Sequence, residues 1–215
     1  MIPLLHDFTD ERVLVFGGGP VGARKARRFA REASVTVVSP DFAGADFGGA
    51  ELVRAAPDAD EVAGWIDRTD PALVVAATDD ADLNAAIETA AREAGTLVNR
   101  TDEHGGRDAG SVVVPATVRD DPVVAAVATG GASPALSKYL REQVEAEIDG
   151  AGEMADLTAD LREELRERGV PPETRRAAIR AVVNSRRVWK ALDSGGTNQR
   201  QVATDVIGDE MGDLS

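Results

Sequence analysis

The chain has 215 residues, 43% of them hydrophobic, which suffices for a domain of ordinary size plus a smaller one and excludes global disorder. A formal net charge of −14 argues against general nucleic-acid binding, which needs a basic face to neutralise phosphates. The sequence holds no cysteine, so disulfides, thiolate metal sites and a cysteine nucleophile are excluded. It has neither an apolar run of about 18 residues nor a signal-peptide pattern, so we expect a cytoplasmic protein without a membrane partner.

Lysine is scarce among the basic residues, since only Lys25, Lys138 and Lys190 are lysines. Abundant carboxylates with little lysine predict a halophile protein, because molar salt screens charges over about 3 Å and makes self-repulsion tolerable. The alternative is an acidic protein whose composition reflects a GC-rich genome.

The first half alternates strand and helix patterns, which predicts an α/β fold with a doubly wound parallel sheet of Rossmann type. Apolar or β-branched runs predict strands at 13–16, 34–38, 51–54, 72–77 and 96–99. Helical patterns lie at 21–32, at 60–67 and from a cap at Asp79 or Asp80 to residue 94.

The pattern changes in the second half. Apolar segments at 111–115 and 122–128, separated by a turn at 119–122, predict a hairpin followed by a helix over 134–148. Residues 150–152 are typical of a linker. One helix then runs from about Met154 to a stop at 169–172, a second is lined by Ile179, Val182, Val183, Trp189 and Leu192, and a short third helix frays from about Asp209. We expect three parts: a Rossmann domain at 1–111, a small α+β segment at 112–149 and a helical domain at 150–215.

Gly17, Gly19 and Gly22 form G-x-G-x-x-G between the first strand and the first helix. In a dinucleotide site the first glycine permits the tight turn, the second admits the pyrophosphate and the third lets the helix pack on its strand. The helix N-terminus offers unpaired N–H groups to the phosphates. The motif therefore predicts NAD binding, and the alternative is a glycine-rich turn without a ligand.

Asp41 follows the second strand, about 20 residues after the glycine motif. An acidic residue there commonly binds the ribose hydroxyls and rejects a 2′-phosphate, which favours NAD over NADP. Pro40 bends the chain at this point, so the alternative is a helix cap for the residues from Phe42 onward.

Thr78 and Asn99 end the fourth and fifth strands, and Asp102 follows closely. Because the carboxyl ends of parallel strands line the ligand crevice, we expect Thr78 and Asn99 to meet the cofactor. Asp102 is a candidate general base if partial burial raises its pKa towards neutrality, and the alternative is a solvated loop aspartate. His104 is a candidate to assist proton transfer beside Asp102, and the alternative is an exposed loop histidine. The two histidines show no metal-ligand spacing, so we expect no metal site.

A second glycine turn precedes the helix that starts near residue 134, and its N–H groups suit an anionic substrate. Basic residues near these segments in sequence predict a cationic patch for a polycarboxylate: Lys138, Arg141, Arg100, Arg107 and Arg119. The candidate substrate-binding residues are Thr129, Gly130, Gly131, Ser133 and Lys138.

Taken in order, the motifs of this chain resemble the precorrin-2 dehydrogenase and sirohydrochlorin ferrochelatase family, also found as the N-terminal module of siroheme synthase. The likeness covers essentially the whole chain. It rests on Gly17–Gly22 with Arg24-Lys25-Ala26, Ala77-Thr78-Asp79-Asp80 with Leu83-Asn84, Asn99-Arg100-Thr101-Asp102, Val114-Pro115-Ala116 and Thr129-Gly130-Gly131-Ala132-Ser133-Pro134.

The resemblance implies NAD-dependent oxidation of precorrin-2 to sirohydrochlorin, in the synthesis of siroheme or a related tetrapyrrole. It leaves open whether the protein also inserts Fe²⁺ as a ferrochelatase. It implies that Asp102 is the catalytic base and that Pro20, Val21, Pro40 and Asp41 contact the cofactor. It further implies a homodimer built through residues 112–147 and a helical lobe that helps to enclose the macrocycle.

Two features depart from the fused bacterial enzymes. Thr129 stands where they often carry a serine linked to phosphorylation and substrate access, so that role stays open. Their methyltransferase module has no counterpart in this sequence, so we do not expect methylation of uroporphyrinogen.

Two other functions fit the glycine motif. One is a regulatory module that binds NAD without turnover, and the other is an unrelated NAD oxidoreductase with a different acid–base pair.

Overall fold

The computed structural model describes residues 3–102, 111–195 and 198–213. The chain divides into two compact units, Met1–Val114 and Pro115–Ser215, and each is described by itself. The further division of the second unit at residue 149 stays a prediction.

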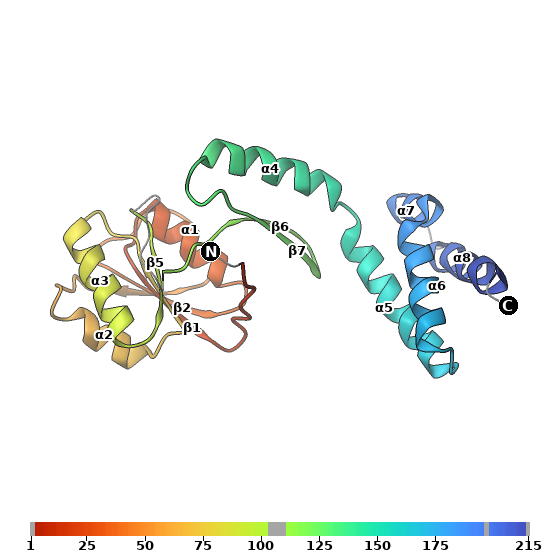
Figure 1. Cartoon of the computed structure of the whole chain (residues 1–215). Helices are drawn as coiled ribbons and strands as arrows, with labels where there is room; N and C mark the ends of the chain where they lie inside the picture. Colours follow the sequence, from red (N-terminus) through yellow and green to blue (C-terminus); the bar gives the residue numbers. More distant parts are fainter. Residues whose placement is uncertain (1–2, 103–110, 196–197, 214–215) are drawn as a thin grey trace. The chain divides into compact units, whose positions relative to one another are not determined.

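The first unit is a five-stranded parallel sheet with the strand order β3-β2-β1-β4-β5 and helices on both faces (Figure 1). Its strands are β1 (Arg12–Phe16), β2 (Ser34–Ser39), β3 (Glu51–Arg54), β4 (Leu73–Ala76) and β5 (Leu97–Arg100). Its helices are α1 (Pro20–Phe29), α2 (Val62–Thr69) and α3 (Ala81–Glu93). The order reverses between β1 and β4, so the predicted doubly wound Rossmann-type sheet is confirmed.

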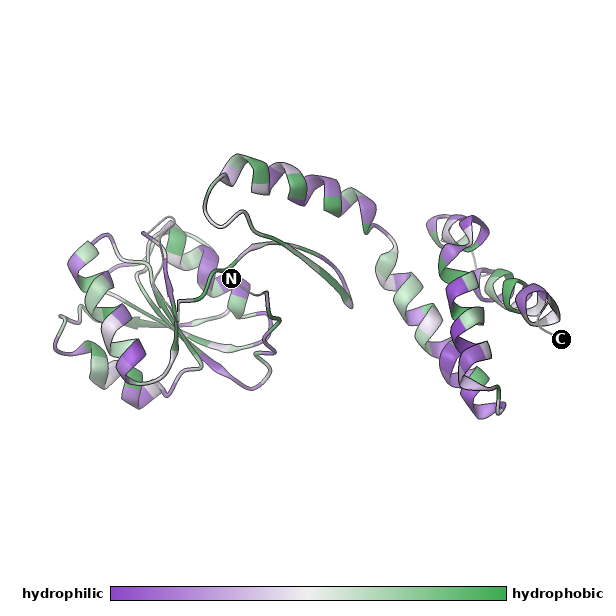
Figure 2. Cartoon of the chain, viewed as in Figure 1, coloured by the Kyte–Doolittle hydropathy of each residue, from purple (hydrophilic) through white to green (hydrophobic). Residues whose placement is uncertain are grey.

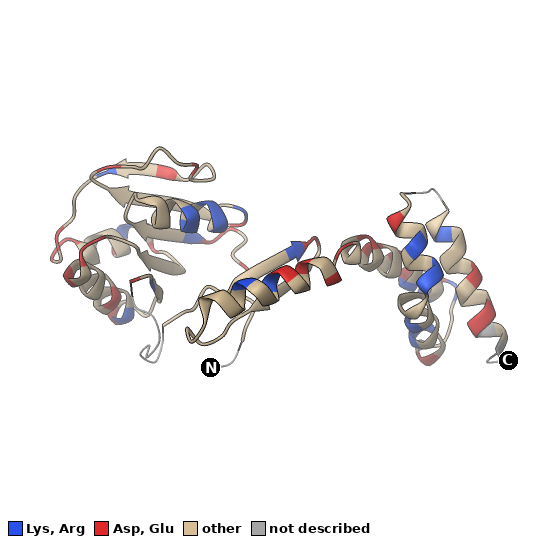
Figure 3. Cartoon of the chain, turned by 90° about the horizontal axis from the view of Figure 1, so that it is seen from above, with Lys and Arg blue, Asp and Glu red and all other residues tan. Residues whose placement is uncertain are grey.

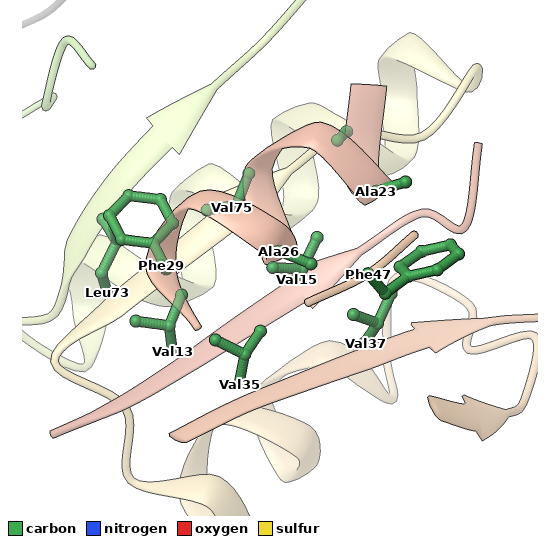
Figure 4. Packing of buried hydrophobic residues seen from close by; sticks show 11 residues of the cluster. Val13, Val15, Ala23, Ala26, Phe29, Val35, Val37, Phe47, Leu73 and Val75 are labelled. Carbon is green, nitrogen blue, oxygen red and sulfur yellow. The ribbon is translucent and has the colours of Figure 1, made fainter. Parts of the chain in front are cut away.

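Alternate side chains of the central strands build two separate cores. Val13 and Val15 of β1 point to the face covered by α1, where they pack with Ala26 and Phe29 (Figure 4). Leu14 and Phe16 point to the opposite face, where α2 and α3 cover them. Burial on both faces explains the unbroken apolar runs of these strands, which appear in green in Figure 2. Each fully buried valine or leucine contributes about 1.5–3 kcal/mol of transfer free energy.

The predicted hairpin is displaced in the structure. Residues 111–115 do not form its first strand; instead the N–H of Val112 donates to the carbonyl of Val98 at 2.7 Å, and Ser111 bridges Val98 in parallel. The hairpin strands are β6 (Ala116–Asp120) and β7 (Val123–Val127), which pair Asp120 with Val123 across a two-residue turn. The prediction that residues 111–115 form a hairpin strand is wrong, because Val112 and Val114 pack against the core on the α1 face of the sheet.

The second unit combines this hairpin with five helices, α4 (Pro134–Glu147), α5 (Ala151–Glu167), α6 (Pro172–Asn184), α7 (Arg186–Asp193) and α8 (Gln199–Asp213). Helix α4 packs on β6 and β7. Leucines of α5 at spacings of four, Leu157, Leu161 and Leu165, form a core with α6, α7 and α8. The predicted small α+β segment and helical C-terminal region are therefore confirmed.

Residues 150–152 are not a free linker. Gly150 precedes α5 with φ +76°, and Gly152 is buried in its first turn. The N–H of Gly152 donates to Asp120 Oδ2 at 2.9 Å, and a Cβ on Gly152 would lie 2.3 Å from the carbonyl oxygen of Asp121. The glycines thus allow α5 to begin against the turn of the hairpin.

The helix predicted through residues 179–192 is broken at Ser185, which adopts an extended conformation with φ −84° and ψ +111°. Asn and Ser are poor residues for a helix interior, and α7 begins after Asn184 and Ser185. Val183 is consequently 41% exposed rather than part of the core.

The predicted fraying from Asp209 is also wrong, since α8 continues to Asp213. Val206 and Ile207 anchor this helix to the core of the second unit. No helix in the described part of the chain is long and apolar enough to cross a membrane.

Candidate functional site

The three glycines of the motif occupy three different environments. Gly17 adopts φ +113°, and a Cβ there would lie 2.3 Å from the carbonyl oxygen of Ala77. A Cβ on Gly22 would lie 1.9 Å from the carbonyl oxygen of Gly17, whereas a Cβ on Gly19 would meet no atom within 4 Å. Gly17 therefore makes the turn, Gly22 lets α1 pack on the loop, and Gly19 leaves open space for a ligand against the backbone.

The start of α1 is built to receive an anion. No side chain caps the helix at Gly19, its first turn holds no acidic residue, and Pro20 occupies the first helical position. Pro20 and Val21 are both exposed. The first N–H groups and the positive end of the helix dipole are therefore available to a pyrophosphate, so these residues fit NAD.

A hollow of about 430 Å³ opens beside this helix end, within the first unit. It gathers residues from α1, from β5 and from the segments that follow β5. Its lining residues are Val21, Arg24, Lys25, Asn99, Arg100, Thr101, Asp102 and Val114. The structure thus brings together Val21, Asn99 and Asp102, three of the residues predicted from the sequence.

Asn99 is hydrogen-bonded to Lys25, which lines the hollow. Its side chain is only 1% exposed, accepts a hydrogen bond from Lys25 Nζ at 2.8 Å and donates to the carbonyl of Val112 at 2.7 Å. Asn99 therefore fixes the ammonium group of Lys25 at the wall of the hollow. Direct contact of Asn99 with the cofactor stays a prediction.

Asp102 is held by Arg100 in a two-point pair, with Nε to Oδ1 at 2.9 Å and Nη2 to Oδ2 at 3.0 Å. The hydrogen bonds from Arg100 hold the pKa of Asp102 below its usual value, and a hydrogen bond from Asn84 acts in the same direction. The expectation that burial raises this pKa is wrong, because the guanidinium outweighs the desolvation of the carboxylate. Asp102 is therefore ionised at neutral pH.

Arg100 is itself anchored in the protein. Its side chain is 13% exposed, and Nη1 lies 3.3 Å from Oε2 of the buried Glu88. Glu88 also pairs with Arg92, at 2.6 Å. This network orients Arg100 towards Asp102.

Asn84 and Thr78 form a second polar network at the carboxyl end of β4. Asn84 is fully buried, and its Oδ1 accepts hydrogen bonds from the Thr78 N–H at 3.1 Å and the Thr78 hydroxyl at 2.8 Å. Asp80 caps α3 by accepting from the N–H groups of Asp82 and Leu83, which decides between the two predicted caps. The Thr78 hydroxyl is thus engaged within the protein, and its contact with a cofactor stays a prediction.

Asp41 does not cap a helix, because the next element in the chain is the strand β3. Its exposed carboxylate pairs with Arg54 Nη1 at 2.7 Å, and the same nitrogen donates to the carbonyl of Pro40. The hydrogen bond from Arg54 lowers the pKa of Asp41. A Cβ on Gly18 would lie 2.2 Å from the carbonyl oxygen of Asp41, so this segment touches the glycine loop.

The predicted substrate-binding residues of the second unit lie together at the start of α4. Thr129 Oγ1 accepts from the Ser133 N–H at 3.3 Å and lies 2.9 Å from Ser137 Oγ. Ser133 Oγ caps the helix by accepting from the Leu136 N–H. Gly130 and Gly131 adopt positive φ, as a tight turn requires. These bonds build a helix cap, and a role towards the substrate stays a prediction.

Each described member of the predicted cationic patch forms an ion pair with an acidic neighbour, and the patch itself stays a prediction. The pairs are Lys138 with Glu142, Arg141 with Glu142 and Glu145, Arg119 with Asp121, and Arg100 with Glu88 and Asp102. His104 and Arg107 lie outside the described residues. Among the residues that the structure describes, no group of three or more His, Cys, Asp or Glu side chains could hold a metal ion.

The structure adds Lys25, Arg100 and Asn84 to the candidate site residues. The sequence marks Lys25 and Arg100 as parts of the motifs that carry the resemblance, and Arg100 also as a member of the predicted cationic patch, but it does not show that Arg100 binds Asp102 or that Lys25 binds Asn99. Asn84 does carry a signal, because it shares one helix face with the buried Ile87 and Ala91 at spacings of three and seven. A polar residue within such an apolar stripe indicates a buried network.

Residues 4–116 match a family described as NAD(P)-binding. The chain is 33% identical to the precorrin-2 dehydrogenase of Methanosarcina barkeri, over 96% of this chain and 93% of that protein. It is 36% identical to the siroheme synthase of Pseudomonas putida, over 94% of this chain but 41% of that protein. Among solved structures, the precorrin-2 dehydrogenase SirC matches 97% of this chain with a TM-score of 0.71 at 19% identity, which shows a common fold.

The glycine loop and the open start of α1 are therefore those of an NAD(P)-binding domain, and the likeness continues beyond that domain into the second unit. The chain belongs to the precorrin-2 dehydrogenase family.

Proposed function

We propose that this protein oxidises precorrin-2 to sirohydrochlorin with NAD as the hydride acceptor. The observation that carries the proposal is the hollow that joins the open start of α1, at Val21, to the ionised carboxylate of Asp102. The relatives named precorrin-2 dehydrogenase and siroheme synthase support the choice of substrate.

The reaction converts precorrin-2 and NAD⁺ into sirohydrochlorin, NADH and a proton. NAD supplies the two-electron acceptor. The N–H groups at the start of α1 bind the pyrophosphate, and Gly19 leaves room for it. Asp102, kept ionised by Arg100, accepts the proton that the macrocycle loses and passes it to water. Arg24 and Lys25 in the wall of the hollow bind substrate carboxylates.

The test is an anaerobic assay of the purified protein with precorrin-2 and NAD in high salt, without iron. Sirohydrochlorin absorbance and NADH are expected to rise in a one-to-one ratio. Asp102→Asn removes the base at nearly constant shape and is expected to lower kcat about 100-fold or more while leaving the Kd for NAD unchanged. Asp79→Asn, at an exposed aspartate after the same sheet edge, is the matched control. A folded, NAD-binding wild type without turnover overturns the proposal in favour of a sensing module, and turnover by Asp102→Asn at the wild-type rate moves the base elsewhere.

Iron insertion is a finer part of this proposal. The siroheme synthase relatives support it, and an ionised Asp102 suits removal of the pyrrole protons that Fe²⁺ displaces. Addition of Fe²⁺ to sirohydrochlorin tests it separately. Siroheme formation that depends on Asp102 supports a chelatase, and a rate equal to that without protein restricts the enzyme to dehydrogenation.

The proposal also includes a homodimer that works in the cytoplasm. No residue of α4, which is described in full, is buried, and three large apolar side chains share one face of it: Leu136, Tyr139 and Leu140 at 46%, 57% and 37% exposure. Such a face is typical of a subunit interface.

A further inference from the structure

A second hollow, of about 440 Å³, lies within the second unit between α5 and α6. It is lined by Arg162 from α5 and by Pro172, Arg175, Arg176, Ile179 and Arg180 from α6. The hollow is therefore walled by arginine, with an apolar surface between the guanidinium groups.

Three of these arginines form no ion pair with the described residues of the chain. Within the described ranges, Arg176 pairs with Glu173, but no carboxylate forms an ion pair with Arg162, Arg175 or Arg180. The acidic residues of α5 nearest to Arg162 in the sequence pair with other arginines: Glu163 with Arg166, and Asp160 and Glu164 with Arg200. Figure 3 shows the basic and acidic residues of these helices in blue and red.

This arrangement runs against the character of the chain, which has 38 acidic and 24 basic residues. Surface arginines in such a protein readily find carboxylates, as Arg141 and Arg166 do. Three guanidinium groups left uncompensated around one hollow raise the local positive potential and favour an anionic ligand.

The geometry points to several carboxylates carried on an apolar body. Arg175 and Arg180 are five residues apart on α6, which separates their Cα atoms by about 7.5 Å along the helix axis. Ile179 lies between them and is half-buried. Guanidinium groups bind carboxylates with paired hydrogen bonds, and the spread of three such groups over an apolar floor suits a ligand with acidic arms around a hydrophobic centre.

We propose that the hollow of Arg162, Arg175 and Arg180 binds a polycarboxylate, and that this polycarboxylate is a tetrapyrrole with acidic side chains. The identity of the tetrapyrrole rests on the proposed function, whereas the polycarboxylate class rests on the arginines alone. The hollow then holds the acidic arms of one edge of the macrocycle.

The test uses uroporphyrin, a redox-inert tetrapyrrole with eight carboxylates, and the full-length protein in the lowest salt that keeps it folded by circular dichroism. Fluorescence titration compares the wild type with Arg175→Gln/Arg180→Gln. The double variant is expected to bind uroporphyrin about tenfold or more weakly, and to bind coproporphyrin, with four carboxylates, with a smaller loss. Arg186→Gln/Arg187→Gln, which removes two exposed arginines of α7 outside the hollow, is the matched control and is expected to bind as the wild type does.

Hydrogen exchange locates the binding. Uroporphyrin is expected to protect the amides of α6 in the wild type and the control but not in Arg175→Gln/Arg180→Gln. Equal affinity and equal protection in all three proteins overturn the proposal. If pyrophosphate protects α6 as strongly as uroporphyrin does at equal concentration, the hollow takes any anion, and the assignment to a polycarboxylate is wrong.

Turnover is measured in parallel with precorrin-2 and NAD. Arginine-dependent binding of uroporphyrin without oxidation of precorrin-2 supports the polycarboxylate site and overturns the dehydrogenase. Normal oxidation of precorrin-2, with no loss of uroporphyrin affinity in the double variant, supports the dehydrogenase and overturns the polycarboxylate site.

Discussion

Arg100 binds both carboxylate oxygens of Asp102, at 2.9 and 3.0 Å, and is itself anchored by the buried Glu88. This relationship sets the protonation state of the proposed base. A carboxylate paired in this way is a weaker base than a buried, unpaired one, but it is unprotonated over the whole neutral range. In the proposed reaction Asp102 would therefore rely on its position and charge more than on its basicity.

Arg100→Gln is expected to raise the pKa of Asp102 towards its ordinary value of 3.8, because the hydrogen bonds from Arg100 are the largest cause of the lowering. The depressed pKa contributes stability that is present above the unfolded-state pKa and is lost as pH falls through the folded-state pKa. Because the variant lacks the hydrogen bonds from Arg100, the titration midpoint of Asp102 in ¹³C NMR of the carboxyl groups is expected to move to higher pH. Arg12→Gln, which breaks an exposed pair with Asp70, should leave it in place. An unchanged midpoint in Arg100→Gln contradicts the assignment.

Gly19 and Gly22 are expected to respond to alanine in opposite ways. Gly19→Ala places its Cβ in open space, so the melting temperature should hold while the Kd for NAD rises about tenfold, because the methyl group occupies the approach of the pyrophosphate. Gly22→Ala places its Cβ 1.9 Å from a backbone oxygen and should cost about 1–3 kcal/mol of stability or more. Calorimetry and NAD titration of both variants check this. A Gly19→Ala protein with wild-type NAD affinity would falsify the role given to that glycine.

Asp41 is expected to set the preference for NAD over NADP. Asp41→Ser removes the carboxylate and releases Arg54, which can then pair with a 2′-phosphate. The ratio of kcat/KM for NAD to kcat/KM for NADP should fall about tenfold or more. Asp67→Asn, at an exposed aspartate of α2, is the control. If Asp41→Ser keeps the wild-type ratio, cofactor choice is made by other residues.

Gly152→Ala is expected to weaken the packing of α5 on the hairpin, since its Cβ would lie 2.3 and 2.9 Å from two backbone oxygens. A loss of about 1–3 kcal/mol is expected in the unfolding of the second unit. Gly208→Ala, in α8, meets no atom within 4 Å and should be neutral or add about 0.5–1 kcal/mol through helix propensity. Thermal unfolding followed by circular dichroism compares the two variants. Equal melting temperatures would show that α5 does not depend on this contact.

The exposed face of α4 is expected to mediate the homodimer. Leu136→Lys/Leu140→Lys places two charges on that face and should convert a dimer into a monomer in sedimentation velocity, with unchanged helix content. Val183→Lys, at a similarly exposed valine of α6, should not change the mass. A wild type that sediments as a monomer rules out the dimer.

The amino-acid sequence alone determined the first unit almost completely. The strands of its sheet are apolar runs separated by helical patterns, and β3 begins and ends where it was predicted. Most of the glycine motif is equally local, since the positive φ of Gly17 and the close packing of Gly22 on Gly17 arise within one loop, whereas the crowding of Gly17 comes from Ala77, which follows β4. Such features can be recognised because one stretch of chain carries both the pattern and its cause.

Only the tertiary structure decided how residues distant in the sequence act on one another. The apolar pattern of residues 111–115 predicts a hairpin strand, but Val112 and Val114 pack against the core on the α1 face of the sheet. Tertiary packing therefore decided the structure of this segment. The pKa of Asp102 depends on where Arg100 is held, and Arg100 is held by Glu88 on another element. The described basic residues of the predicted patch pair with acidic neighbours, whereas Arg162 and Arg175 line one hollow because α5 and α6 pack through their leucines and valines. The reason is physical: ion pairs and burial depend on distances in space, and separation along the chain does not determine those distances.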